Sequence, residues 1–172
     1  MIILLFILLA IISIGLFLWQ FSNLISVFYG SPYVMMDKIV IREALKLANL
    51  KKGEIFYDLG CGNGDVLIEA AKMGAKATGF EISPYYYIYA KLKTQAFKNI
   101  KVKYRDINKV DFSKADVIYC YLLPEFLKKL ASKFRKEMKK SSRLISVGFP
   151  IPMLKNEIVS SIDKHKIFIY KF

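Results

Sequence analysis

The sequence is poor in the residues that bind transition metals. Its 172 residues include only two cysteines, Cys61 and Cys120, and one histidine, His165. That is too few for a zinc site built from Cys and His, and we predict no metal. Cys61 lies in a glycine-rich turn and Cys120 in an apolar run. We expect both to be reduced, small and apolar in character, which suits the cytoplasm.

Charge is missing from the first part of the chain. Residues 1–36 contain no charged side chain, so all 27 Lys and Arg and all 14 Asp and Glu lie in residues 37–172, which carry the net charge of +13. The run MIILLFILLAIISIGLFLWQF exceeds the roughly 20 apolar residues that cross a bilayer. Aromatic residues at its end suit a membrane interface. We therefore predict a transmembrane anchor over 1–22, a juxtamembrane link over 23–36 and one domain over 37–172.

A cleaved signal peptide is the alternative to an anchor. The apolar run has no basic residue before it, is longer than a signal peptide needs, and is followed by no cleavage site of small residues. Every Lys and Arg follows the run, so the positive-inside rule places the C-terminal domain in the cytoplasm. The prediction is a single-pass membrane protein.

The domain alternates strand and helix patterns. An α/β fold with a mostly parallel sheet, helices on both faces and a ligand at the carboxyl edge follows from that alternation. The last two strands have no helix between them, so we expect them to be antiparallel. The predicted helices cover 37–50, 64–73, 84–97 and 124–140. The predicted strands cover 54–59, 75–81, 99–107, 116–122, 143–149, 156–162 and 165–172.

The first strand runs into the glycine-rich turn FYDLGCGNGD, residues 56–65. A turn between a strand and a helix is the usual place for a nucleotide-like ligand, and glycines let the backbone approach it closely. This turn differs from the G-x-G-x-x-G phosphate fingerprint and has no Walker lysine. Asp58, just before the glycines, would repel a pyrophosphate but attract an ammonium group. S-adenosylmethionine has that ammonium group and no phosphate.

Two further acids end the next two predicted strands. Glu81 is in position to hold ribose hydroxyls, and Asp106 to meet the adenine amine. Each acid alone is equally well explained as a solvated carboxylate, but three acids in register with the glycines favour a cofactor site. The predicted cofactor-binding residues are Asp58, Gly60, Cys61, Gly62, Gly64, Glu81, Ile82, Asp106 and Ile107.

The order of these motifs resembles the seven-β-strand methyltransferases. More narrowly, it is similar to the small lysine methyltransferases related to the mitochondrial ATP-synthase c-subunit methyltransferase and to their prokaryotic relatives. The resemblance implies a Rossmann-like sheet of seven strands and S-adenosylmethionine as cofactor. Its mitochondrial members also carry an N-terminal membrane segment. The matching segments are SPYV (31–34), YDLGCGNGD (57–65), GFEISP (79–84), VIYCYLLP (117–124), the basic helix that follows, and SRLISVGFPIP (142–152).

The resemblance has one departure and suggests two catalytic residues. Where the family continues its Pro-Tyr-Val motif with Pro and Thr, this chain has Met35 and Met36, and the Thr is expected to help hold the carboxylate end of the cofactor. Tyr33 is kept. Tyr121, at the end of the fourth strand, is placed by analogy to orient an amine. Packing roles are the alternative for both tyrosines.

The function that follows is a membrane-anchored methyltransferase acting on lysine side chains of a protein, with a membrane complex as one possible target. Alternatives are a lipid or small-amine methyltransferase, an RNA methyltransferase, and a non-catalytic module that binds S-adenosylmethionine. The charge of +13 suits either nucleic acid or anionic lipid. The predicted anchor favours lipid. The segment after the fourth strand also lacks the Asn/Asp-Pro-Pro-aromatic motif of nucleobase methyltransferases.

Overall fold

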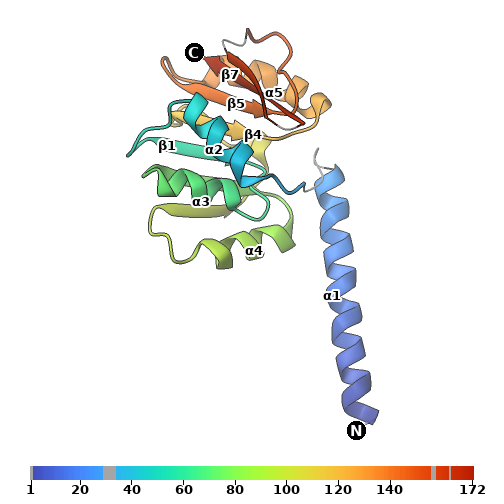
Figure 1. Ribbon diagram of the computed structural model, residues 1–172. Coiled ribbons are helices and arrows are strands. Elements are labelled where there is room, and N and C mark those ends of the chain that lie inside the picture. Colours follow the sequence, from blue (N-terminus) through green and yellow to red (C-terminus); the bar gives the residue numbers. More distant parts are fainter. Residues whose placement is uncertain (1, 29–33, 156–157, 163) are drawn as a thin grey trace.

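One seven-stranded sheet organises the domain (Figure 1). The computed structural model describes residues 2–28, 34–155, 158–162 and 164–172. The strand order is β3-β2-β1-β4-β5-β7-β6. The strands are β1 (Ile55–Leu59), β2 (Lys76–Glu81), β3 (Ile100–Tyr104), β4 (Val117–Cys120), β5 (Arg143–Val147), β6 (Ile158–Ile162) and β7 (His165–Lys171).

Strands β1 to β5 pair in parallel, and β7 pairs antiparallel with both β5 and β6. The predictions of a mostly parallel Rossmann-like sheet and of an antiparallel closing pair are therefore confirmed. From β1 the chain builds outward to β3, then returns to place β4 on the other side of β1. The sheet thus has its switch point between β1 and β4, where α/β proteins of this kind bind ligands.

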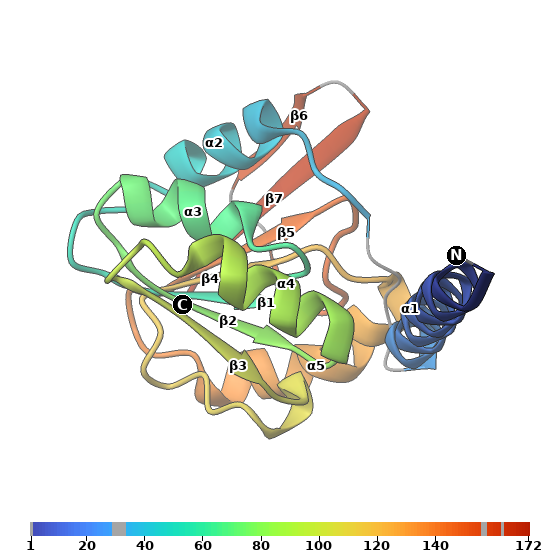
Figure 2. The same ribbon diagram turned by 90° about the horizontal axis from the view of Figure 1, so that it is seen from below.

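Helices cover both faces of the sheet (Figure 2). Apolar residues of α2, α3 and α4 pack on one face, and those of α5 pack on the other together with the segment after β3. Ser83 caps α4, because its hydroxyl accepts a hydrogen bond from the backbone N–H of Tyr86 at 3.4 Å. The domain helices are α2 (Lys38–Leu47), α3 (Asp65–Lys72), α4 (Pro84–Thr94) and α5 (Pro124–Glu137), with a short 3-10 helix η1 (Ile107–Lys109).

The third strand is shorter than the sequence pattern predicts. β3 ends at Tyr104, and Asp106 caps η1, because its carboxylate accepts from the backbone N–H of Asn108 at 2.9 Å. An aspartate that bonds the backbone two residues ahead favours a turn over an extended strand. Asp106 therefore follows the strand end rather than forming it.

Helix α1 (Ile2–Phe28) extends away from the domain (Figure 1). Its segment Ile2–Phe21 is long and apolar enough to cross a membrane, and none of that segment is buried against the domain. The helix continues beyond residue 22 because the next six residues, which we predicted as part of the link, include no proline, glycine or charge. The C-terminal half of α1 contacts α4, where the Trp19 indole donates a hydrogen bond to the Tyr86 hydroxyl.

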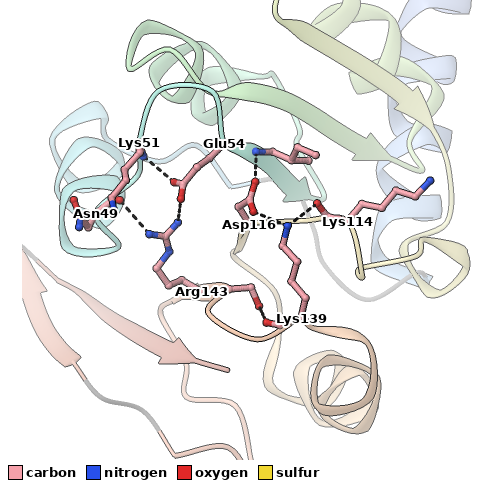
Figure 3. A network of polar contacts seen from close by, with 9 residues as sticks. Asn49, Lys51, Glu54, Lys114, Asp116, Lys139 and Arg143 are labelled. Carbon is pink, nitrogen blue, oxygen red and sulfur yellow. Dashed lines mark hydrogen bonds and ion pairs between the residues drawn. The ribbon is translucent and has the colours of Figure 1, made fainter.

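Ion pairs join the loops at the amino edge of the sheet (Figure 3). Arg143 at the start of β5 reaches the Glu54 carboxylate before β1 at 2.5 Å and the backbone carbonyl of Asn49 at 3.2 Å. The other oxygen of Glu54 accepts from the backbone N–H of Lys51 at 2.8 Å. These contacts hold the end of α2 against the central strands.

Asp116 forms a second junction at the same edge (Figure 3). One of its oxygens accepts from the backbone N–H of Ile55 at 2.7 Å, and the other lies 2.5 Å from the Lys139 ammonium. Burial raises the pKa of Asp116, but Lys139, the Ile55 N–H and Arg143 outweigh burial, so the pKa is lowered overall. The ionised carboxylate thus clamps β4 to β1.

Replacing Asp116 tests this junction. We expect Asp116→Ala to lower the free energy of unfolding by about 1 to 3 kcal/mol, because the Ile55 N–H is left without an acceptor. The matched variant Asp116→Asn keeps an acceptor and loses only a partly exposed ion pair, which should cost about 1 kcal/mol or less. Urea unfolding of the full chain in detergent, followed by circular dichroism, measures both.

The same junction predicts a pH dependence. Because the pKa of Asp116 is lowered on folding, its carboxylate stabilises the fold at neutral pH, and that contribution is lost as the pH falls below the ordinary value of 3.8. The stability gap between the natural chain and Asp116→Asn should therefore close in acid. Equal stability of the Asn and Ala variants at neutral pH would contradict the proposed role of the Ile55 contact.

Candidate active site

A cleft lies at the carboxyl edge of the sheet, at the switch point between β1 and β4. Its empty volume is about 900 Å³, open solvent at the mouth included. The ends of β1, β2 and β4 line it, with the turn after each strand, the segment after β3 and the residues that lead into α2. Of the predicted cofactor residues, those lining the cleft are Asp58, Gly60, Cys61, Gly62, Glu81, Ile82, Asp106 and Ile107.

The glycine turn is shaped by its backbone. Gly60 has a φ of +79°, a left-handed conformation that favours glycine, and its N–H donates to the Phe80 carbonyl at 2.9 Å. Gly64 does not line the cleft. A Cβ there would lie 3.1 Å from Thr94 Cγ2, so this glycine lets α3 start close to α4. Gly64 thus has a packing role behind the turn, and its contact with the cofactor stays a prediction.

Asp58 ends β1 inside the cleft with an unsatisfied carboxylate. Its residue is only 2% exposed, and Oδ2 has no hydrogen-bond partner among the described residues. Burial, and then the charge of Glu81, raise its pKa well above the usual value. Buried polar atoms normally have a partner, because leaving one unpaired costs free energy. An unpartnered buried acid at a cleft is thus ready to accept from a ligand that carries donors.

Glu81 ends β2 and is tied to two turns. One oxygen accepts from the backbone N–H of Gly62 at 2.8 Å, and the other from those of Ile82 and Ser83 at 2.9 and 2.8 Å. Burial raises its pKa, while these three N–H groups oppose the shift. A carboxylate has about four acceptor positions. Three are used by the backbone, which fixes the side chain and leaves it able to accept once more.

Asp106, Ile107 and Ile82 also line the cleft. Asp106 is partly exposed, and one of its oxygens also accepts from the Asn108 side-chain amide at 2.9 Å. Ile107, next to it in sequence, is buried, and Ile82, directly after β2, is half-buried. The lining of the cleft thus includes a carboxylate and two apolar side chains, as a site for a planar base would require.

Tyr121 follows β4 and lines the cleft. Its ring meets the ring of His165 edge-on, with centroids 5.9 Å apart and planes at 89°. A Cβ at Gly148 would lie 2.8 Å from Tyr121 Cε2, so that glycine leaves room for the ring. Tyr33, the other predicted catalytic residue, lies outside the described residues. Of the two methionines that replace the family's Pro-Thr, Met36 is buried at the cleft and Met35 is exposed.

Sequence reasoning missed Tyr119. It lines the cleft, lies opposite Asp58 in the pairing of β4 with β1, and its buried hydroxyl has no hydrogen-bond partner among the described residues. The signal was present in the sequence, because residues two apart on a strand share a face. With Tyr121 placed at the ligand, the alternation in the sequence Tyr-Cys-Tyr would have placed Tyr119 on the same face, beside it.

Comparison with known proteins identifies the family. The family model of the ANTKMT methyltransferase domain matches residues 58–158. This range includes Asp58 and the glycines after it, Glu81, Asp106, and strands β4 and β5. The chain belongs to this family. It is also 30% identical over 148 residues to a protein-lysine N-methyltransferase of Saccharolobus islandicus, covering 81% of this chain and 92% of that one.

The chain is also similar to a larger sequence relative and to a solved structure. The lysine N-methyltransferase of the ATP synthase c-subunit from Xenopus laevis is 28% identical over 70% of this chain, but the match spans only 54% of that relative. The chain therefore matches about half the length of that larger relative. Among solved structures, an RNA methyltransferase of Salinibacter ruber in complex with S-adenosyl-L-homocysteine has a TM-score of 0.77 and 25% identity, covering 80% of this chain and 93% of that one.

The cleft fits S-adenosylmethionine, the cofactor that the family and fold imply. The unsatisfied oxygen of Asp58 suits an ammonium group, and the remaining acceptor capacity of Glu81 suits a hydroxyl. No phosphate-binding lysine is required, and the acids that line the cleft would oppose a phosphate. These acceptor groups therefore agree with a ligand that is cationic at one end and carries a ribose.

Asp58→Asn should separate cofactor binding from stability. The pKa of Asp58 is raised above 3.8 on folding, so its ionised carboxylate destabilises the folded state. This destabilisation is absent at low pH and grows as the pH rises above 3.8. At pH 7.5 without ligand, we expect Asp58→Asn to raise the free energy of unfolding by about 1 to 3 kcal/mol. S-adenosylmethionine should raise the melting temperature of the natural chain but not of the variant.

Circular dichroism is the suitable readout, because the only tryptophan lies on α1. The matched control is Asp111→Asn, at an exposed carboxylate whose pKa is lowered, chiefly by the backbone N–H of Ser113; this variant should bind ligand normally and gain no stability. The stability difference between Asp58→Asn and the natural chain should vanish near pH 3.8 and below. A ligand-induced shift in Asp58→Asn equal to that of the natural chain would contradict this assignment.

Proposed function

We propose that this protein is an S-adenosylmethionine-dependent protein-lysine N-methyltransferase, held at a membrane by α1 with its domain in the cytoplasm. The observation that carries the proposal is the cleft at the β1–β4 switch point, whose acids and glycines lie within the segment that matches the family. The two sequence relatives described above are named as lysine N-methyltransferases, and so is a third, an adenine nucleotide translocase lysine N-methyltransferase of Mus musculus. A protein lysine is therefore the first acceptor to test.

In this proposal each strand end holds one part of the cofactor. Asp58 accepts from the ammonium group, and the backbone of Gly60 to Gly62 follows the methionine portion. Glu81 accepts from the ribose hydroxyls, and its three backbone contacts keep it in place for that role. Asp106, with Ile82 and Ile107, holds the adenine. When bound, S-adenosylmethionine supplies a methyl group attached to a positively charged sulfur.

The protein's own contribution is to position a neutral amine and exclude water. A lysine side chain must give up its proton before it can act as a nucleophile. Tyr121 lines the cleft, and its ring packs against the ring of His165 and against Gly148. Its hydroxyl is therefore suited to orient the amine. Tyr119, two residues earlier and buried, supplies a second hydroxyl at the cleft. No metal or catalytic triad is needed for this chemistry.

The membrane part of the proposal rests on α1. Ile2–Phe21 has the length and composition of a span and is not covered by the domain. The proposed boundaries are an anchor over 1–22, a link over 23–36 and the methyltransferase domain over 37–172. The positive-inside rule gives the orientation, since all Lys and Arg follow the span. A tether of this kind raises the effective concentration of targets at the same membrane.

RNA is the second candidate acceptor. The solved structure from Salinibacter ruber is described as an RNA methyltransferase, and the net charge of +13 suits a polyanion. The same charge equally suits an anionic membrane surface.

Transfer of a tritiated methyl group distinguishes these acceptors. Full-length protein in nanodiscs is incubated with methyl-tritiated S-adenosylmethionine and native membranes, and label is then separated into protein, lipid and RNA. We expect label in a discrete protein band, on lysine after hydrolysis, and none with Asp58→Asn. Label in the lipid or RNA fraction would contradict the lysine assignment. No label in any fraction, with cofactor bound, would favour a non-catalytic binding module.

Tyr121→Phe tests the proposed orienting hydroxyl. Removing one hydrogen bond to the amine should lower kcat by about 10- to 100-fold, which reaches only the lower end of general acid–base contributions because the hydroxyl orients the amine rather than transferring a proton. The affinity for S-adenosylmethionine should be unchanged, because Asp58 and Glu81 hold it. Tyr104→Phe, at an exposed position on β3, is the matched control and should keep full activity. A Tyr121→Phe variant with normal kcat would reduce Tyr121 to a packing role.

A further inference from the structure

The outward face of α4 is apolar. Ala90 and Thr94 are buried against the domain, and the opposite side of the helix exposes Tyr85, Ile88, Tyr89 and Leu92. These four residues, hereafter the α4 stripe, follow the i, i+3, i+4, i+7 spacing of a single helix face. Ile88 is 56% and Leu92 60% exposed with α1 in place, so α1 does not cover them.

Helix α5 shows what an ordinary surface helix of this domain looks like. It buries Phe126, Leu127 and Leu130 against the sheet, and between them it exposes Lys128 and Lys129 to solvent. A helix on a globular protein normally has one apolar and one polar face in this way. Helix α4 is apolar on both, and contiguous exposed apolar residues mark an interaction site.

The position of α4 relates the stripe to the anchor. In Figure 1, α4 lies at the underside of the domain, on the side toward which α1 extends. Figure 2 looks from below, nearly along α1, and shows α4 lying across that direction with β3 beside it. The contact between Trp19 and Tyr86 puts α4 level with the end of the apolar segment Ile2–Phe21. If that segment spans a bilayer, α4 lies along the bilayer surface.

The charge around the stripe is of one sign. Residues 84–105, from the start of α4 through β3, contain no Asp or Glu. All of their basic residues are exposed, and Lys93 also pairs with Asp65 at 2.8 Å. Apolar residues flanked by lysine, with tyrosines at the boundary, are typical of a helix that lies in the headgroup region of an anionic membrane. The six basic residues are Lys91, Lys93, Lys98, Lys101, Lys103 and Arg105.

We propose that the α4 stripe docks on an anionic lipid bilayer, so that α4 is an interfacial helix. This inference rests on the proposed function only in taking α1 as a membrane span. Ile82 and Tyr86, before and within the first turn of α4, line the cofactor cleft. Docking α4 therefore holds the mouth of the cleft at the bilayer surface. The acceptor lysine of this enzyme lies close to the headgroups, not far out in the cytoplasm.

Spin labels on the stripe test the docking directly. The native Cys61 and Cys120 are buried, so a cysteine introduced on the surface is labelled selectively. Full-length Ile88→Cys and Leu92→Cys are labelled in nanodiscs of phosphatidylcholine with phosphatidylglycerol. The matched control is Lys129→Cys on the exposed face of α5. The readout is the accessibility of each label to oxygen, which enriches in lipid, relative to a water-soluble nickel chelate.

We expect the oxygen-to-nickel ratio at positions 88 and 92 to exceed that at position 129 about tenfold, because an interfacial helix buries its apolar face among the headgroups. The ratio should fall in pure phosphatidylcholine and at high salt, where the basic residues lose their partner. A ratio at position 92 equal to that at 129 would overturn the inference. So would spin–spin coupling between labels at position 92, which would show that a second copy covers the stripe.

The outcome is independent of catalysis. Lipid-like labels on a protein that transfers no methyl group would support the docking while the proposed function fails. Water-like labels on an active enzyme would overturn the docking alone.

Discussion

The buried carboxylate of Glu81, at the end of β2, holds together the turns that form the cleft. Glu81 is bonded through one oxygen to the turn after β1 and through the other to the turn after β2. Those two turns begin α3 and α4, so the starts of both helices and the shape of the cleft depend on a single side chain. Its three backbone partners hold the negative charge within the domain and orient it beside Asp58. Asp58 Oδ2, by contrast, accepts no hydrogen bond from the described residues.

The two edges of the sheet use charge in opposite ways. At the amino edge, Asp116 and Arg143 are paired with lysine, glutamate and backbone groups, and these contacts bind β1, β4 and β5 into one unit. At the carboxyl edge, Asp58 and the Tyr119 hydroxyl are buried without partners among the described residues. Arg143 Nε, at the amino edge, is also without a partner among the described residues, but it belongs to an ion-paired cluster, whereas Asp58 and Tyr119 line the cleft. This division allows a ligand to be recognised without weakening the frame that holds the site.

Much of this arrangement was predictable from the sequence, and the reasons for the remainder are physical. Asp58 and Glu81 could be found because each ends a strand whose apolar run is unambiguous, and parallel strands bring such ends together. Asp106 was harder, because its side chain bonds the backbone ahead and ends the strand early. Gly64 was assigned to the ligand because a glycine needed for a turn and one needed for close helix packing look alike in sequence. The sequence pattern placed the α4 stripe within a helix over 84–97 but did not reveal that these residues face outward, since that direction depends on tertiary packing.

The unpartnered Asp58 has a consequence for how long the chain persists. A folded protein that buries an unsatisfied charge gains stability from any ligand that pairs with it, in proportion to the logarithm of that ligand's concentration. Without the ligand, a larger fraction of chains is unfolded and open to proteolysis. In the proposed complex, a methyl donor that pairs with Asp58 would therefore also protect the chain from proteolysis.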